Sequence, residues 1–109
     1  MRILLDHNVP MPLRKLLIGH QVETAYIRGW SQLVNGALIS AAENDGFDLV
    51  ITTDKGIRYQ QILSGRKIAL LVLSTNDWAA IRLSTGAINS MINKMDGPCF
   101  LEMELPPAN

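Results

Sequence analysis

The stretch that decides the fold is Asp48–Lys55, which has the sequence DLVITTDK. Its apolar run Leu49–Ile51 is too short for a helix and is bounded by polar residues, so it predicts a buried β-strand. In open α/β sheets, functional side chains lie just beyond the carboxyl ends of the strands. Asp54 would stand at such a position, behind the hydroxyl groups of Thr52 and Thr53. The segment therefore predicts a central strand with a candidate site at its exit.

The N-terminal segment Ile3–Asp6, with the sequence ILLD, repeats this pattern of a short apolar strand followed by an aspartate. If the two strands are neighbours in one sheet, the carboxyl groups of Asp6 and Asp54 converge at its edge. Two carboxylates in a partly buried place repel each other, and a bound cation removes that cost. The pair therefore predicts a small anionic pocket for a hard divalent cation.

The rest of the chain alternates helix and strand patterns. Further strands are expected at residues 21–25, 68–73 and 100–105. Helices are expected at residues 9–17, 35–44, 55–63 and 77–95, with a kink in the last one at 84–86. Such alternation predicts an α/β fold in which helices cover both faces of a mostly parallel sheet. We expect one domain over residues 1–109, folded to residue 105, with 106–109 as a tail.

Composition limits the class of protein. The 109 residues are 48% apolar, enough to fill one core. No apolar run approaches the roughly 18 residues of a membrane span, and the N-terminus reads as a strand without a signal-peptide cleavage site, so a cytoplasmic protein is expected. A single cysteine excludes an intrachain disulfide and a cysteine cluster for zinc. The net charge of zero argues against a protein that coats nucleic acid by charge alone.

Charge is nevertheless unevenly placed, because residues 55–76 contain four basic side chains and no acidic one. A basic face beside an acidic pocket suits a phosphodiester substrate that approaches a metal, and it equally suits an ordinary solvated helix face. In the same window, Tyr59 follows Arg58, a pair that could stack on a base and reach a phosphate. The alternative is a half-buried tyrosine that supports its helix.

Each polar residue near the two strand exits also has a structural interpretation. Asp6 could form an Asx turn, and Asn8 and Asn35 are good N-cap residues for the helices that follow them. His7 would point to the opposite face from Asp6 if the strand geometry persists, as an ordinary loop histidine. Thr52 and the next residue could orient a carboxylate or a water molecule through their hydroxyl groups.

Six short motifs resemble those of the DUF5615 family of small PIN-like proteins. They are LLDHNVP at 4–10, GW at 29–30, NG at 35–36, TTDK at 52–55, YQQ at 59–61 and LSTN at 73–76. The resemblance covers the chain to about Asp96. It implies a three-layer α/β/α sandwich and a relation to PIN domains, which include metal-dependent ribonucleases and the toxins of bacterial toxin–antitoxin systems. It further implies Mg²⁺ or Mn²⁺, single-stranded RNA as substrate, an antitoxin protein as partner and, as in many PIN-type proteins, a homodimer.

The resemblance also assigns residues. Asp6 and Asp54 match two metal carboxylates, and Asn35 falls where relatives usually have an acid. His7 and Gly56 stand where further acids are frequent, so the acidic site is incomplete. The substrate-binding candidates are Asn8, Thr52, Thr53, Lys55, Arg58 and Tyr59.

Three functions remain open at this stage. The first is a PIN-like ribonuclease in which Asp6 and Asp54 bind the metal and Asn35 supplies a neutral ligand or orients water. The second is an eroded PIN-like module that binds RNA or a protein without cleavage. The third is a receiver-type phosphoacceptor domain with Asp54 as the acceptor, against which stands the lack of a lysine in the last strand, 100–105.

Overall fold

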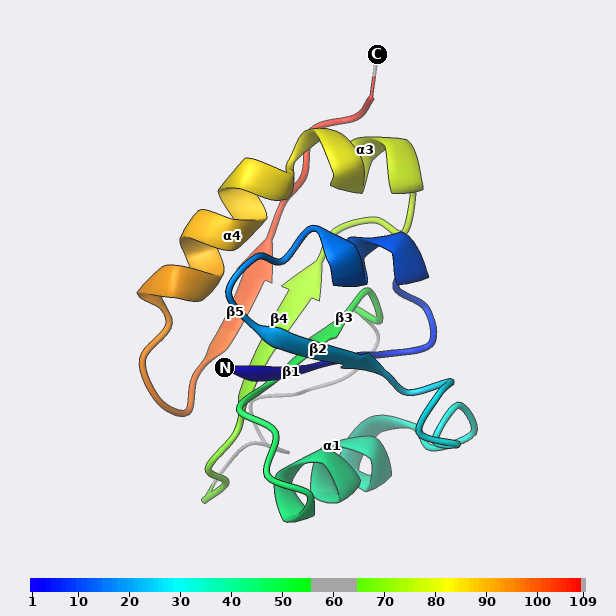
Figure 1. Cartoon of the computed structure of the whole chain (residues 1–109), viewed down its shortest axis with the longest axis vertical. Helices are drawn as coiled ribbons and strands as arrows, with labels where there is room; N and C mark the ends of the chain where they lie inside the picture. Colours follow the sequence, from blue (N-terminus) through cyan, green and yellow to red (C-terminus); the bar gives the residue numbers. More distant parts are fainter. Residues whose placement is uncertain (56–64, 109) are drawn as a thin grey trace.

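A five-stranded parallel sheet forms the centre of the molecule in a computed structural model that describes residues 1–55 and 65–108 (Figure 1). The strands follow the order β2-β1-β3-β4-β5, and all four pairings are parallel. The strands are β1 (Arg2–Leu5), β2 (Gln21–Thr24), β3 (Leu49–Thr52), β4 (Ala69–Leu73) and β5 (Phe100–Met103). The expected α/β fold is confirmed.

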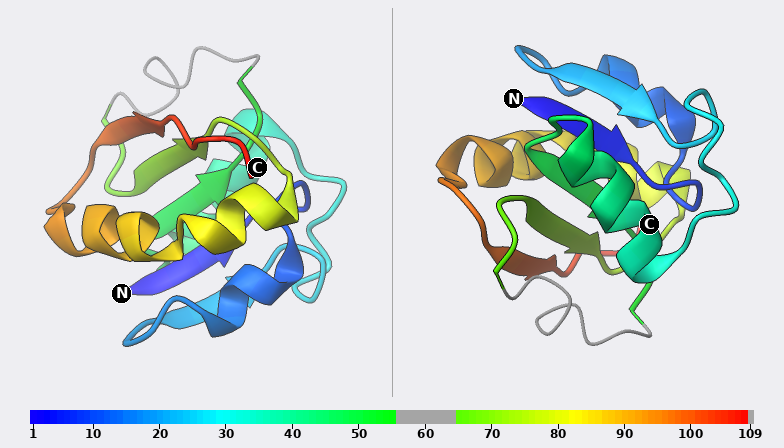
Figure 2. Two further views of the ribbon diagram at one scale, coloured as in Figure 1. Left: turned by 90° about the horizontal axis from the view of Figure 1, so that it is seen from above. Right: turned by 90° about the horizontal axis from the view of Figure 1, so that it is seen from below.

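Helices lie on both faces of this sheet, which gives three layers (Figure 2). They are the 3₁₀ helix η1 (Met11–Lys15) and the α-helices α1 (Asn35–Asn44), α3 (Trp78–Leu83) and α4 (Thr85–Lys94). Helix α1 covers one face, and η1, α3 and α4 cover the other. Over the described ranges, none of the helices has the length and apolar character needed to cross a membrane.

Strand alternation divides the core between the two faces. Successive side chains of a strand point to opposite sides of the sheet. Ile3 and Leu5 therefore pack with η1, α3 and α4, whereas Leu4 packs with α1 and Phe47. The inner strands β3 and β4 are buried along their whole length, as expected for parallel strands covered on both faces.

An aromatic and ionic cluster joins the end of α1 to the start of β1. The guanidinium of Arg2 lies 4.2 Å from the centre of the Phe47 ring and pairs with Glu23 and Asp45. Arg28 pairs with the same two acids. Hydrogen bonding to Glu23 raises the pKa of Arg2 above its ordinary value. This cluster lies away from the carboxyl ends of the strands and holds the α1 layer against the sheet.

Two of the expected helices differ in the structure. The first was expected from residue 9 with Asn8 as its cap, but η1 begins at Met11 after Pro10, because the side chain of Asn8 is bonded elsewhere. The long helix expected at 77–95 is two helices that meet at Ser84. The helix expected at 55–63 lies almost wholly outside the described residues.

Candidate functional site

The carboxyl ends of β1 and β3 form the natural place for a site in this topology. Strand β1 lies between β2 and β3, so the chain leaves it on one side for β2 and β3 is added on the other. Parallel α/β sheets bind ligands in the crevice at such a reversal of strand order. Leu5 pairs with Ile51, and the N–H of Asp6 donates to the carbonyl oxygen of Ile51 at 2.9 Å. Asp6 therefore lies across from Thr52, the last residue of β3.

Thr52 links the two candidate acids through a single hydroxyl group. Its side chain is buried, and its Oγ1 donates to Oδ2 of Asp6 at 2.8 Å. The same oxygen accepts a hydrogen bond from the backbone N–H of Asp54 at 3.1 Å. The structure thus brings Asp6, Thr52 and the backbone of Asp54 together at one edge of the sheet.

Asn8 fastens the loop after β1 to the exit of β3. Its Oδ1 accepts from the backbone N–H of Thr53 at 3.1 Å and lies 3.4 Å from Oγ1 of Thr52. The hydroxyl of Thr53 lies 3.5 Å from the carbonyl oxygen of Asn8. Asn8 is therefore a member of the site and not the helix cap that was expected.

His7 lies in the turn after β1, as expected for a loop residue, but the expectation that it points away from Asp6 is wrong. Strand β1 ends at Leu5, so strand alternation does not extend to His7. Its ring folds back until Nδ1 lies 3.0 Å from Oδ1 of Asp6, which also accepts the His7 backbone N–H at 2.7 Å. Because a carboxylate can only accept, Nδ1 carries the hydrogen and Nε2 faces outward. The contact between His7 and Asp6 depends on the turn after β1, and the sequence pattern does not predict the shape of that turn.

The other predicted site residues have no described contact with Asp6 or Thr52. Helix α1 begins at Asn35 with Val34 at its N-cap, and the side chain of Asn35 is not described. Arg58 and Tyr59 lie outside the described residues. Lys55 is exposed and lines a pocket of about 240 Å³ together with side chains from β4 and the end of β5, including Glu102 and Glu104.

Two residues of the basic segment 55–76 are engaged in contacts within the protein. Arg66 pairs with Glu43 of α1 at 3.3 Å, and the same carboxylate accepts the backbone N–H of Lys67 at 2.6 Å. These contacts tie the entry of β4 to α1.

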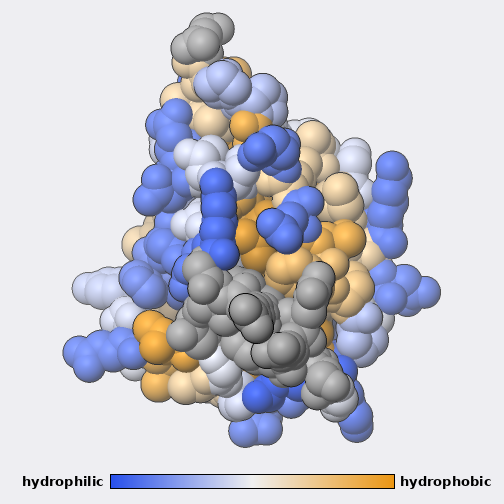
Figure 3. Space-filling view, turned by 180° about the vertical axis from the view of Figure 1, so that it is seen from behind, coloured by the Kyte–Doolittle hydropathy of each residue, from blue (hydrophilic) through white to orange (hydrophobic). Residues whose placement is uncertain are grey.

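Seen from behind, the molecule has hydrophobic side chains near the middle of its face and hydrophilic ones around them (Figure 3).

Two further pockets open along the carboxyl edge. One, of about 350 Å³, adjoins Asp6 and His7 and has Tyr26 in its wall. The other, of about 450 Å³, lies between the exit of β4 and the segment after β5. Sequence reasoning missed Tyr26 as a site residue, although its position directly after an alternating strand is the signal that could have identified it.

The carboxylate of Asp6 retains limited capacity for one weakly held divalent cation. A carboxylate has about four lone-pair sites, and three of those on Asp6 accept hydrogen bonds from His7 and Thr52. Counting the contacts made by residues 1–55 and 65–108, one site on Oδ2 is left for a cation. Within residues 1–55 and 65–108, no three acidic, histidine or cysteine side chains gather as a metal cage. Mg²⁺ often binds through one or two carboxylates, water and a substrate phosphate, which is the arrangement that these residues permit.

Comparison of the chain with family models, with curated proteins and with solved structures finds no match. The resemblance of the six motifs to PIN-like proteins stays a prediction.

Proposed function

We propose that this protein is a PIN-like endoribonuclease that uses one Mg²⁺ or Mn²⁺ ion to cleave single-stranded RNA. The observation that supports the proposal is the hydroxyl of Thr52, which links the carboxylate of Asp6 to the backbone N–H of Asp54 at the reversal point of the sheet. Carboxylate oxygens at such a position are suitable ligands for a hard cation.

Each residue has a distinct task in this proposal. Asp6 and Asp54 would hold the ion, which when bound would polarise a phosphoryl oxygen and lower the pKa of a water molecule. Thr52 fixes the orientation of the Asp6 carboxylate by donating to Oδ2. Asn8 fixes the exit of β3, so that Asp54 keeps its place when substrate binds. Asn35 would supply a neutral oxygen ligand or orient water, as the resemblance implies.

RNA would be held beside the ion by the exposed ammonium of Lys55 and by Arg58 and Tyr59. The resemblance also supports a biological setting, that of a cytoplasmic toxin restrained by a cognate antitoxin protein. Growth arrest on expression of the chain alone, relieved by the product of a neighbouring short gene, would test that setting.

The direct test is cleavage of a single-stranded RNA by the wild-type protein and by Asp54→Asn, with Mg²⁺ or Mn²⁺ and with chelator. We expect cleavage that requires metal and falls about 100-fold or more in Asp54→Asn, because one of the two charged ligands is lost. Asp54 is preferred to Asp6 for this test, since Asp6 also bonds His7 and Thr52. Asp96→Asn, an exposed acid outside the site, is the matched control. Full activity of Asp54→Asn would overturn the mechanism.

A second candidate is a module that binds RNA or a protein partner and does not cleave. It is favoured by one observation, that most of the acceptor capacity of Asp6 is already used by donors of the protein itself. Calorimetry separates the two candidates. Binding of Mn²⁺ that Asp54→Asn abolishes supports the nuclease, whereas RNA binding without any Mn²⁺ binding supports the module.

A further inference from the structure

The pocket beside Asp6 has a composition different from that of an acidic metal site. It lies across the carboxyl ends of β1 and β2, has a volume of about 350 Å³ and falls within the usual ~300–1,000 Å³ of small-ligand sites. Seven residues line it, namely Asp6, His7, Val9, Met11, Thr24, Tyr26 and Ser31. The first two belong to the candidate metal site, so a ligand in this pocket would lie against that site.

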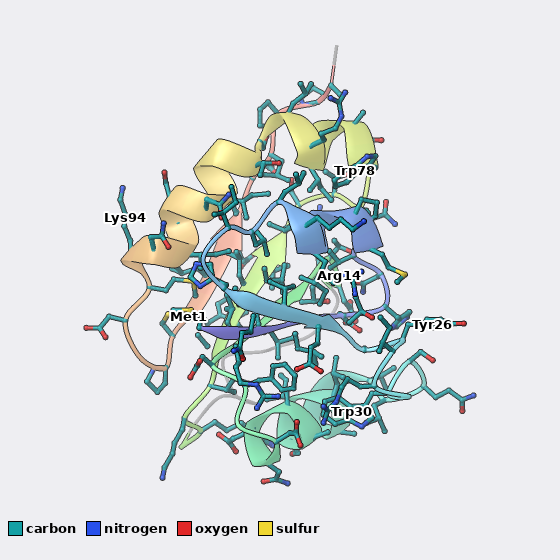
Figure 4. All side chains as sticks on the ribbon, in the orientation of Figure 1. Met1, Arg14, Tyr26, Trp30, Trp78 and Lys94 are labelled. Atoms are coloured by element: carbon teal, nitrogen blue, oxygen red, sulfur yellow. The ribbon has the colours of Figure 1, made fainter. Side chains whose placement is uncertain are left out.

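One part of the lining is apolar and flat. Val9 is buried and forms the floor, while the thioether of Met11 and the ring of Tyr26 are exposed at the walls. Tyr26 is 65% exposed and lies beyond the carboxyl end of β2, with its side chain directed outward, well apart from Trp30 (Figure 4). An aromatic ring exposed in this way is an effective platform for stacking.

The other part of the lining offers hydrogen-bonding groups. Nε2 of His7 has no partner among residues 1–55 and 65–108, because the ring is held through Nδ1 by Asp6. Oγ1 of Thr24 accepts from the N–H of Ile27 at 3.1 Å, and its hydrogen finds no acceptor in the same part of the chain. Ser31 adds a second hydroxyl at the rim. These groups could bond the edge of a planar ring whose face lies on Tyr26.

We infer that this pocket binds one nucleobase of a single-stranded RNA, stacked on Tyr26 beside Met11 and read along its edge by His7 and Thr24. The inference rests on the proposed function for the identity of the ligand and adds a subsite to it. A phosphate is the wrong occupant, because the wall contains the carboxylate of Asp6 and none of the described lysine and arginine residues lines the pocket. A base is neutral and planar, and single-stranded RNA is recognised by stacking exposed bases on aromatic side chains.

The geometry also suggests the direction in which the RNA runs along the edge of the sheet. With a base beside His7, the adjoining phosphate would reach the edge shared by Asp6 and Asp54, because both belong to the ends of neighbouring strands. On the other side of this edge, Lys55 follows β3 and is the basic side chain that could contact the next phosphate, while the pocket it lines continues to Glu102 and Glu104. We therefore expect the RNA to run from the β2 side of the edge toward β3.

The test uses a single-stranded RNA trinucleotide that carries one 2-aminopurine, titrated with the full chain in the presence of chelator. Without metal no cleavage is expected, so the fluorescence reports base binding alone. We expect stacking to quench the fluorescence, and Tyr26→Ala to weaken binding about tenfold or more. Tyr26→Phe keeps the ring and should bind within about twofold of wild type. Because Tyr26 is exposed, both variants should keep the fold, and circular dichroism checks this.

The matched control is Ile27→Ala, since this neighbour is 58% exposed and does not line the pocket. Its binding should equal that of wild type. Quenching that survives Tyr26→Ala, or no quenching in the wild-type protein at any concentration up to 1 mM or so, would overturn the subsite and leave the pocket to a partner of another class. If quenching follows the expected pattern but RNA is never cleaved with metal, the subsite stands and the nuclease proposal fails.

Discussion

Thr52 joins the two acids of the candidate site through one hydroxyl group. The hydrogen of that group goes to Asp6, which leaves a lone pair for the backbone N–H of Asp54. A valine at this position would have nearly the same shape and neither function. The role of Thr52 is therefore chemical and not one of packing alone, although the residue is only 1% exposed.

We predict that Thr52→Val lowers the free energy of unfolding by about 2 kcal/mol, because a buried carboxylate loses a donor and an amide loses an acceptor. Urea unfolding followed by tryptophan fluorescence measures this loss. The matched control is Thr53→Val, whose hydroxyl makes only a long contact of 3.5 Å with Asn8 and should change stability by less than about 0.5 kcal/mol. Equal losses in the two variants would show that the bridge contributes nothing.

Strand geometry made the neighbouring exits of β1 and β3 predictable from the sequence. Asp6 and Asp54 follow apolar runs, and parallel strands bring their exits to one edge. His7 and Asn8 were misread for one common reason. Both lie in the turn after β1, where the chain has left the strand, and their contacts are made with Asp6 and with the exit of β3. No periodicity in the sequence specifies such contacts.

At the scale of the element, the break between α3 and α4 falls where the sequence predicted a kink, at 84–86. Ile81, Ile88 and Ile92 fall at helical spacing and all three are buried in one core, so the pattern alone predicts one helix. The chain instead changes direction at Ser84, which ends α3 and precedes α4. The hydroxyl of Thr85 bonds the carbonyl oxygen of Arg82 at 2.8 Å, satisfying a group that the break leaves open.

The end of α1 is fixed by a glycine that has little room for a side chain. Gly46 has a φ of +86°, and a Cβ there would lie 3.1 Å from Nη1 of Arg2. That guanidinium is held by Glu23, Asp45 and the ring of Phe47, so it cannot move freely. The helix end and the first strand are thus coupled through one arginine.

We predict that Gly46→Ala destabilises the protein by about 2 kcal/mol, from the left-handed backbone and from displacement of Arg2. The control is Gly29→Ala, where φ is +77° and no atom lies within 4 Å of the added Cβ, so about 1 kcal/mol of backbone strain is expected alone. Thermal unfolding of both variants measures the difference. Identical losses would mean that the contact with Arg2 costs nothing.

At the scale of the whole molecule, the balance of charge limits how RNA can be held. The formal net charge is zero, and four of the ten basic residues fall in the window 55–76. Of the described residues that line the pockets named above, Lys55 is the only lysine or arginine. Binding should therefore depend on stacking and on the metal more than on a broad cationic surface.

We predict that the logarithm of RNA affinity falls with the logarithm of salt concentration with a slope between about −0.7 and −1.4, which corresponds to one or two phosphate contacts. Fluorescence anisotropy of a short RNA with chelator, over a range of salt concentrations, measures it. Lys55→Gln should flatten the slope by about 0.7, and Lys94→Gln, an exposed residue at the end of α4, should leave it unchanged. A slope steeper than about −3 would contradict this description and indicate a basic surface elsewhere.

The order of the strands has a consequence for folding during translation. Strand β1 precedes both of its neighbours, and Leu4 meets Val50 only after the 45 residues between them have been synthesised. At about 5–20 residues per second on the ribosome, that wait lasts several seconds. During it, the β3-facing N–H and C=O groups of β1 lack their ladder partners and are open to mispairing with other nascent chains. A translational pause before residue 52 emerges should therefore change the yield of folded protein more than an equal pause later in the chain. A chaperone that binds the chain before that point should have a similarly large effect.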